Sequence, residues 1–340
     1  MKLLFLPVVL FMMLLTACEQ ELPLPSASGT PRIVVYSELT AGQSPVVRVG
    51  KSKVVGPGVD NGFDLVKNAN VQLMTKDGSL VETLTYSKDS NNLMSVYSGT
   101  SKLSAGINYR VIVSVPGMKE AIASALIPPA PSVVLHDTLR TILNGRPVLR
   151  FNFTIAPQPG VHQYIVMEAL KQSAQIDIYF TYNGVRYNKA ENEDLYESVK
   201  NQPGVVITKD TTFLDDYLRI PVYTQDENAD NNQIGGLNEN YNSILFNQTY
   251  KPINTNFYIN ATALSSSPQE ANAPKGRVLV YVKSVSNQYY DFLMTYEKVK
   301  RNPGLNSLIQ AIQLRNNLVG GLGIVGGSNQ ILYSLYYDEL

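Results

Sequence analysis

The sequence predicts an all-β protein of two domains, and three patterns support this prediction. Short segments alternate apolar and polar residues, as half-buried strands do. Turn signals such as Asp77-Gly78 and Asn183-Gly184 separate them, because both residue types tolerate positive φ. Residues 128–131, three of which are proline, then interrupt the alternation. Proline cannot donate a hydrogen bond to a β-ladder, so this segment is the expected domain boundary.

The first domain, residues 32–128, is predicted to be an immunoglobulin-like β-sandwich. The alternation is clearest over Tyr109–Val115 and recurs over Ala69–Met74. About seven short strands with turn signals every 8–12 residues are typical of this fold. The segment before it, residues 18–31, is rich in proline and small polar residues, which indicates a flexible tether.

The second domain, residues 132–340, is predicted to be β-rich with one or two short helices near the C-terminus. Alternation is strict over Val148–Ile155, and a hairpin is expected around Asn183-Gly184. Residues 188–202 are expected to form a loop with a short helical turn. Further strands are expected at Gln163–Leu170, Gln175–Tyr182, Val185–Tyr187, Val205–Thr208, Tyr217–Tyr223, Tyr241–Tyr250, Asn256–Leu264, Gly276–Val285 and Ile331–Tyr337. Two long polar stretches, Thr224–Asn240 and Ser265–Lys275, are of the kind that is often functional.

One helix is predicted over Asn287–Arg301, ending at Asn302-Pro303-Gly304. Apolar and aromatic residues recur there at three- and four-residue steps. Such a stripe favours a helix packed on a sheet. The alternative is a ligand or partner contact made by Tyr289, Tyr290 and Tyr296.

Residues 1–17 are predicted to be an export signal, with Lys2 followed by a short apolar run over Leu3–Leu15. Spanning a bilayer needs roughly 20 residues, so this run is too short. Leu15-Thr16-Ala17-Cys18 resembles a lipobox, in which the thiol receives a diacylglyceryl group and the chain is cut before it. We therefore expect Cys18 to be lipidated, and several acyl chains anchor better than one. The alternative is a plain secretory signal.

The composition excludes several classes of site. Cys18 is the only cysteine, so an intramolecular disulfide, a cysteine zinc site and a cysteine nucleophile are excluded. Lysine and arginine number 28, as do aspartate and glutamate. A chain this neutral has no basic surface for nucleic acid and no polybasic patch for anionic lipid headgroups.

No cofactor or metal is predicted. Gly321–Gly326 spells GxGxxG, but a nucleotide site needs a following helix and a later acidic residue, whereas a turn and a strand are expected here. Asp226–Asn232 has oxygen ligands at alternate positions, but Leu237 stands where a calcium loop needs glutamate, so a solvated loop is favoured. The two histidines, His136 and His162, lack metal-ligand spacing.

The sequence also predicts that the protein is not an enzyme. It contains no GxSxG nucleophile elbow. The acidic pairs Asp215-Asp216 and Glu193-Asp194 could serve a glycosidase only if their carboxyls converged. Adjacent residues on a strand point to opposite faces, which argues against this. A hydrolase is the weakest of the three functional hypotheses.

An ordered set of short motifs covers nearly the whole chain after the signal. They are the lipobox Cys18, Arg32–Tyr36, Pro45–Ser52, Val66–Val71 with the Asp77-Gly78 turn, Gly106–Tyr109, Tyr289–Phe292 and Asn316–Ile324. In these motifs and their order the chain resembles domain-of-unknown-function family 4249, a group of Bacteroidota lipoproteins. Residues 188–240 match least well.

The resemblance implies an outer-membrane lipoprotein, of a kind often encoded beside TonB-dependent receptors. It supplies no catalytic residues. It also implies that Thr138 and Thr211, which follow aspartates in a sequence like that phylum's O-glycosylation motif, are candidate glycosylation sites.

The leading hypothesis is a non-enzymatic lipoprotein anchored in the outer membrane and facing the cell surface. It would act as an accessory or substrate-capture partner of a TonB-dependent β-barrel transporter. The alternative is a stand-alone surface lipoprotein that binds glycans or peptides.

Overall fold

The computed structural model describes residues 30–53, 62–90, 94–235, 239–248, 251–261, 275–301 and 314–336. The predicted export signal, Cys18, nearly all of the tether, residues 265–274 and the predicted helix stop at 302–304 lie outside these ranges. Within them, no helix is long and apolar enough to cross a lipid bilayer. Strands dominate the described chain, which confirms the all-β prediction.

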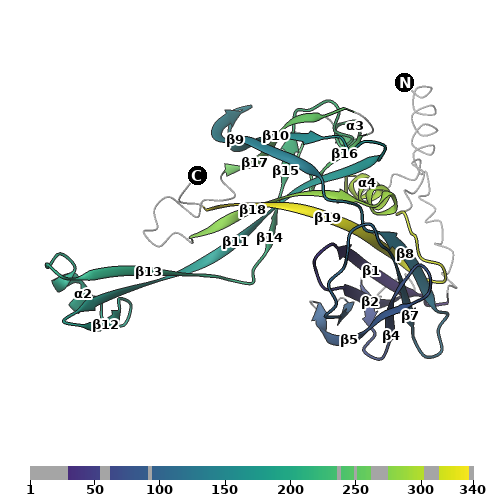
Figure 1. The fold of residues 1–340 in the computed structure, drawn as a ribbon, viewed down its shortest axis with the longest axis horizontal. Helices are drawn as coiled ribbons and strands as arrows, with labels where there is room; N and C mark the ends of the chain where they lie inside the picture. The colour runs from purple at the N-terminus through teal and green to yellow at the C-terminus, as the bar shows by residue number, and fades with distance from the viewer. Residues whose placement is uncertain are drawn as a thin grey trace, which may run out of the picture.

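The first part of the chain is a β-sandwich, seen at the lower right of Figure 1. One sheet contains β1 (Ile33–Thr40), β2 (Val46–Ser52), β3 (Phe63–Leu65) and β6 (Met94–Ser98). The other contains β4 (Asn70–Thr75), β7 (Asn108–Ser114) and β8 (Ala121–Leu126). The long strand β5 (Leu80–Ser90) pairs with both β4 and β6 and so joins the sheets. Alternate residues of both sheets, such as Val35, Val49, Val71 and Val111, form one buried core.

The second part is built on a sheet that contains β11 (Gln163–Tyr182), β14 (Leu218–Ile220), β16 (Ile244–Gln248) and β18 (Lys275–Val285). A four-stranded sheet of β9 (Ser132–Leu143), β10 (Arg146–Ala156), β15 (Val222–Thr224) and β17 (Ile253–Asn260) packs on one of its faces. Phe151, Phe153 and Phe257 form the aromatic centre of this core and lie against Met167 and Val280.

The last strand, β19 (Leu322–Tyr336), connects the two parts (Figure 1). Its first half runs parallel to β1, from Val34 opposite Leu322 to Thr40 opposite Ser328. Its second half pairs antiparallel with β18. The prediction of a turn followed by a strand at Ile331–Tyr337 is therefore wrong at its start, because the glycine-rich segment is itself part of the strand. β19 thereby makes one continuous sheet of both parts.

β11 also differs from the prediction. Gln163–Leu170 and Gln175–Tyr182 were expected to be separate strands, but they are the two halves of one 20-residue strand. The residues between them stay in the sheet because they continue the pairing with β18, from Lys171 opposite Val278 to Ala174 opposite Lys275. The Gln172 side chain also donates to the Leu214 carbonyl at 2.7 Å and accepts from Arg277 at 2.8 Å.

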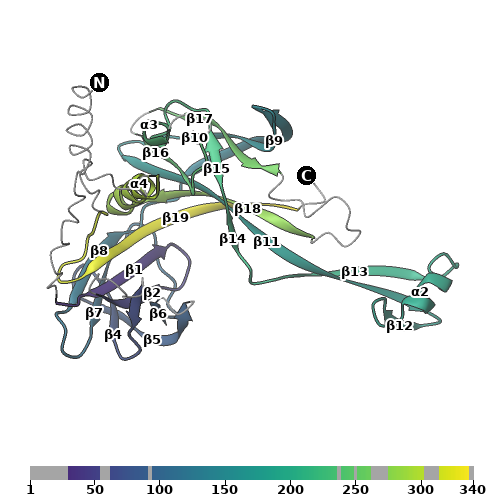
Figure 2. The ribbon, with the colours of Figure 1, turned by 180° about the vertical axis from the view of Figure 1, so that it is seen from behind.

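The outer half of β11 leaves the body as a long arm with β12 (Val185–Asn188), α2 (Glu193–Val199) and β13 (Val206–Phe213), as Figures 1 and 2 show. We call residues 174–213 the arm. Asn183 and Gly184 have φ of 51° and 79°, which confirms the predicted hairpin turn. α2 is the helical turn predicted within residues 188–202.

Helix α4 (Asn287–Arg301) has the predicted bounds and lies across the sheet near the crossing of β1, β19, β18 and β11 (Figure 2). It buries Tyr289, Tyr290 and Glu297. The short helix α3 (Asn232–Gly235) lies beside it. The space between α4 and the sheet is the candidate site.

Candidate functional site

A cavity of about 330 Å³ lies between α4 and the sheet. Its sheet side is formed by Tyr36 of β1, Glu168 of β11 and Lys283 of β18. Its helix side is formed by Phe292, Leu293, Tyr296 and Glu297, and Arg219, Asn242 and Ser243 close one end. The cavity therefore receives side chains from both parts of the chain.

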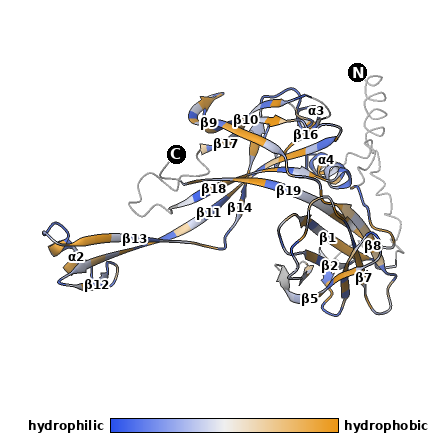
Figure 3. Cartoon of the chain, in the orientation of Figure 1, coloured by the Kyte–Doolittle hydropathy of each residue, from blue (hydrophilic) through white to orange (hydrophobic). Residues whose placement is uncertain are grey.

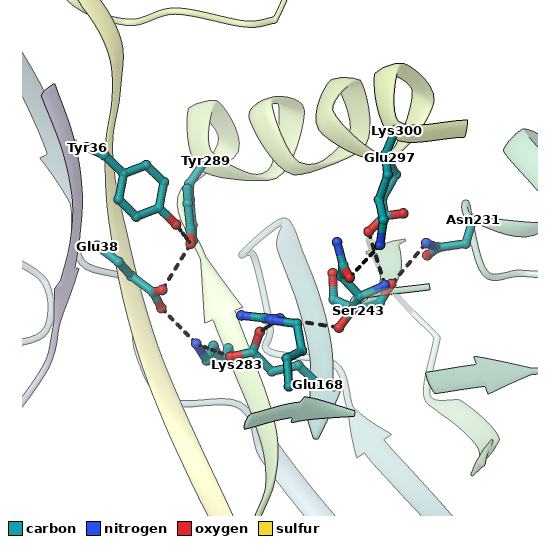
Figure 4. A network of polar contacts seen from close by, with 11 residues as sticks. Tyr36, Glu38, Glu168, Asn231, Ser243, Lys283, Tyr289, Glu297 and Lys300 are labelled. Atoms are coloured by element: carbon teal, nitrogen blue, oxygen red, sulfur yellow. Dashed lines mark hydrogen bonds and ion pairs between the residues drawn. The ribbon is translucent and has the colours of Figure 1, made fainter. Parts of the chain in front are cut away.

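A chain of buried charges crosses the sheet side of the cavity (Figure 4). Lys283 forms ion pairs with Glu38 at 3.0 Å and with Glu168 at 2.5 Å. Glu168 also accepts a hydrogen bond from Arg219. These residues come from β1, β18, β11 and β14, so the ion pairs connect the first sandwich to the second.

The ion pairs change the acidity of the buried groups. Burial alone would raise the pKa of the Glu168 carboxyl, but Lys283 and Arg219 outweigh it and lower the pKa to about 2. Burial would likewise lower the pKa of Lys283, but Glu38 and Glu168 raise it above its ordinary value. Both groups are therefore charged at neutral pH.

Tyr289 connects the helix to this charge chain. Its hydroxyl donates to Glu38 at 2.9 Å and lies 3.2 Å from the Tyr36 hydroxyl (Figure 4). Its ring lies on Gly326 of β19, where an added Cβ would come within 2.4 Å of the Tyr289 Cγ. Glycine at this position therefore lets α4 approach the sheet closely enough to form the site.

The other end of the cavity is organised by Asn242. Its backbone carbonyl accepts a hydrogen bond from Arg219 at 3.2 Å, and its backbone N–H donates to Glu297 at 3.2 Å. Its side-chain oxygen accepts from Lys300 at 2.8 Å. Glu297 is only 2% exposed, and burial raises the pKa of its carboxyl. The Arg219 guanidinium and the buried Glu297 carboxyl thus both bind the backbone of Asn242.

The three tyrosines proposed as contacts have different surroundings. Tyr289 and Tyr296 line the cavity, and Tyr296 is 42% exposed at its mouth. Tyr290 is buried outside the lining, where it donates to Asp230 and packs on Tyr164. Tyr289 and Tyr296 therefore line the cavity, whereas Tyr290 makes a packing contact outside it.

The predicted modification sites lie apart from the cavity. Thr138 is half-buried on β9, and Thr211 is exposed on β13 of the arm. The aspartates that precede them form ion pairs, Asp137 with Arg150 and Asp210 with Arg186. Cys18 lies outside the described residues.

The GxGxxG segment lies in β19, and its glycines allow close packing. Gly323 has a φ of +113°, and a Cβ there would lie 2.0 Å from the Val35 carbonyl oxygen. No helix follows it within the described chain, so the context of a dinucleotide-binding turn is missing.

The segment Asp226–Asn232 is only partly the solvated loop that was expected, since Glu227 and Asn228 are exposed while Ala229 and Asn231 are buried. Asn231 is fully buried and binds the Ser243 carbonyl and the Leu245 N–H. The Asp226 side chain accepts from the N–H of Asn228, and Asp230 accepts from Tyr290. Asp230 therefore links the loop to α4, and Asn231 links it to the start of β16. Across the described ranges, no group of three His, Cys, Asp or Glu side chains is placed to hold a metal ion.

Sequence reasoning missed the charges of the site, although a signal was present. Glu168 and Lys283 each interrupt a run of apolar residues in a part of a strand that is otherwise mostly buried. Charged residues are almost never buried unless they are paired, so each interruption indicated a partner elsewhere in the fold. Glu297 is seven residues after Tyr290 and therefore lies on the same buried side of α4.

The fold and the site define a mainly β protein whose last strand joins two sandwiches below one helix, with a charged cavity at the junction. Residues 19–331 match the model of DUF4249, a domain of unknown function, and the chain belongs to this family. This confirms the resemblance inferred from the motifs. A search of curated proteins found no matching relative.

Proposed function

We propose that this protein is a non-catalytic accessory protein, lipid-anchored at the outer membrane through Cys18. In this proposal it assists a TonB-dependent β-barrel transporter in substrate capture at the cell surface. The family is one of unknown function, so the proposal rests on the sequence of the N-terminus and on the shape of the molecule. The observation that carries it is the arm.

The arm is built as a contact surface rather than as a core. Seven of the eight residues of β13 are exposed, and within the described chain β13 pairs only with β11. Val185, Val206 and Ile207 are 50%, 58% and 41% exposed. Apolar residues of the arm appear in orange in Figure 3. On β13 the exposed apolar residues are Val206 and Ile207 at its first end, and polar and charged residues follow them. An exposed edge strand offers unpaired backbone groups to another chain, which supports a protein partner at the arm.

The partner prediction is tested by removing the arm. Residues 175–212 are replaced by Asn-Gly, which joins Ala174 to Phe213, an antiparallel pair at the base of the arm. No residue of the deleted segment belongs to the buried core clusters of the body, so the body should keep its unfolding temperature. We expect a β-barrel protein to co-purify with the full chain after gentle detergent extraction and to be lost with the variant. Equal recovery with both proteins, or a full chain that stays monomeric, contradicts the proposal.

The anchor prediction is tested at Cys18. Cys18→Ser should abolish incorporation of labelled palmitate and move the protein from the membrane fraction to the soluble fraction. The acyl chains supply the membrane affinity, at about 0.8 kcal/mol per buried methylene. An unlabelled wild-type protein, or a variant that stays in the outer membrane, contradicts the anchor.

The cavity supports a second candidate function, a stand-alone surface lipoprotein that binds glycans or peptides. Its aromatic wall and charged groups are features of small-ligand sites. Saturable ligand binding by the purified protein, together with no barrel partner in any extraction, would favour this candidate over the first.

A further inference from the structure

The cavity below α4 presents charged groups that the protein leaves incompletely paired. Glu297 accepts one hydrogen bond through Oε1, and its Oε2 has no partner among the described residues. Arg219 makes both of its contacts through Nη1, which leaves Nη2 and Nε without partners in the same part of the chain. The Arg219 side chain is 45% exposed, and both residues line the cavity. Ligand groups can therefore reach both.

The two groups have opposite charge and lie on either side of Asn242. Glu168 is not available to a ligand in the same way, because Lys283 and Arg219 already neutralise it. Arg219 is paired with Glu168 but keeps Nη2 and Nε as donors, and an anionic acceptor makes the strongest hydrogen bonds to them. Glu297 has no cationic partner among the described residues, so it requires a cationic donor. A neutral sugar would leave the buried Glu297 carboxylate without a counter-charge, which costs free energy.

The remaining lining residues favour a ligand with an apolar group. Tyr36 and Phe292 have ring centroids 6.2 Å apart, and Phe292 stacks on Tyr296 at 6.2 Å. Leu293 and Val166 complete the wall. A volume of about 330 Å³ is at the small end of ligand pockets, which are roughly 300–1,000 Å³. The cavity therefore fits a ligand of a few tens of atoms or fewer.

We propose that this cavity binds an apolar amino acid or dipeptide in its zwitterionic form. The carboxylate accepts from the free Nη2 and Nε of Arg219, and the ammonium donates to Glu297 Oε2. The apolar side chain lies against Tyr36, Phe292 and Tyr296. This inference rests on the substrate-capture part of the proposed function and is independent of the barrel partner.

The test is calorimetric titration of the full chain in detergent with phenylalanine and Phe-Phe. N-acetylphenylalanine lacks the ammonium, phenylalaninamide lacks the carboxylate, and maltose represents a neutral sugar. A charge-assisted hydrogen bond contributes about 1.5–3 kcal/mol, so each blocked ligand should bind roughly 10- to 100-fold more weakly. Maltose should not bind.

The variant Glu297→Gln keeps the shape of the side chain and removes its charge. It should weaken phenylalanine binding roughly tenfold or more and abolish the preference over N-acetylphenylalanine. Glu193→Gln on α2 of the arm is the matched control, because Glu193 is exposed and far from the cavity lining, and it should change nothing. Tyr296→Ala removes one wall at the exposed mouth and should weaken all apolar ligands alike.

Four results would overturn the proposal. They are no binding of either zwitterion at millimolar concentration, equal binding of N-acetylphenylalanine, maltose binding instead, or full affinity in a folded Glu297→Gln protein. The chain without its arm separates this inference from the partner proposal. It should lose the barrel and keep the ligand, whereas a full chain that recovers the barrel but binds no zwitterion rejects the ligand alone.

Discussion

Replacing Lys283 by methionine is expected to lower the free energy of unfolding by about 3 kcal/mol at neutral pH. The variant leaves Glu38 and Glu168 without the ammonium group between them. Removing one partner of a buried ion pair costs about 3–5 kcal/mol, since the remaining charge is desolvated and unpaired. The loss should lie near the lower limit because Glu168 keeps Arg219. Urea unfolding followed by circular dichroism measures it.

Lys209→Met is the matched control for this substitution. Lys209 lies on the exposed strand β13, in the arm. Its replacement should change stability by less than about 0.5 kcal/mol, as surface substitutions usually do. A Lys283→Met protein that is as stable as the Lys209→Met protein would show that the ion pairs do not hold the two sandwiches together.

The same ion pairs predict how stability depends on pH. The pKa of Glu168 is about 2 in the folded chain and 4.5 in its reference state. A carboxyl with a lowered pKa stabilises the fold above its unfolded value, and this contribution is lost as pH falls from about 4.5 towards 2. The difference corresponds to a loss on the order of 3 kcal/mol.

The pH prediction is tested by comparing two proteins. Other carboxyls also titrate in this range, so wild type is compared with Glu168→Gln. Urea unfolding from about pH 6 to about pH 3 should give a steeper loss of stability for wild type, while the two curves approach one another at low pH. Parallel curves would mean that Glu168 has an ordinary pKa in the folded protein.

The sequence predicted those elements whose signals are local. The periodicity of Tyr289, Leu293 and Tyr296 lies within one helix, and α4 has the expected bounds. The turn at Asn183-Gly184 depends only on the backbone preferences of these two residues, and the structure has the turn there. Both features depend on neighbours a few residues away, which a single sequence displays directly.

The elements that were missed depend on distant pairing. The last strand was expected at Ile331–Tyr337 and the glycine-rich segment before it as a turn, yet Leu322–Ser328 is held in the sheet by parallel pairing with β1. The cavity was missed for the same reason. Glu168 and Lys283 lie on adjacent strands that are more than a hundred positions apart in the sequence, and Glu38 reaches them only because β19 joins the two parts. No local sequence pattern indicates which acidic side chain pairs with which basic side chain.

Replacing Gly326 by alanine is expected to destabilise the protein by about 1–3 kcal/mol and to close or distort the cavity. The added Cβ would lie 2.4 Å from the Tyr289 Cγ and 2.7 Å from its Cβ. These atoms are close to the helix backbone, so α4 itself must shift, and overpacking of a closed core costs this much. The shift would also separate the Tyr289 hydroxyl from Glu38. Urea unfolding measures the stability, and phenylalanine titration measures the cavity.

A double-mutant cycle identifies the cause of that loss. Tyr289→Ala removes the ring atoms at 2.4 and 2.6 Å and keeps the Cβ at 2.7 Å. In this background Gly326→Ala should therefore cost less but still have a cost, with a coupling of about 0.5–3 kcal/mol. Gly323→Ala is the contrasting variant. Its Cβ would meet the Val35 backbone oxygen at 2.0 Å, and its φ of +113° disfavours any side chain. Tyr289→Ala should therefore rescue position 326 and not position 323. If Tyr289→Ala rescues both positions, or neither, then the contact between α4 and β19 is not the reason for glycine at position 326. The cavity would then not depend on that contact.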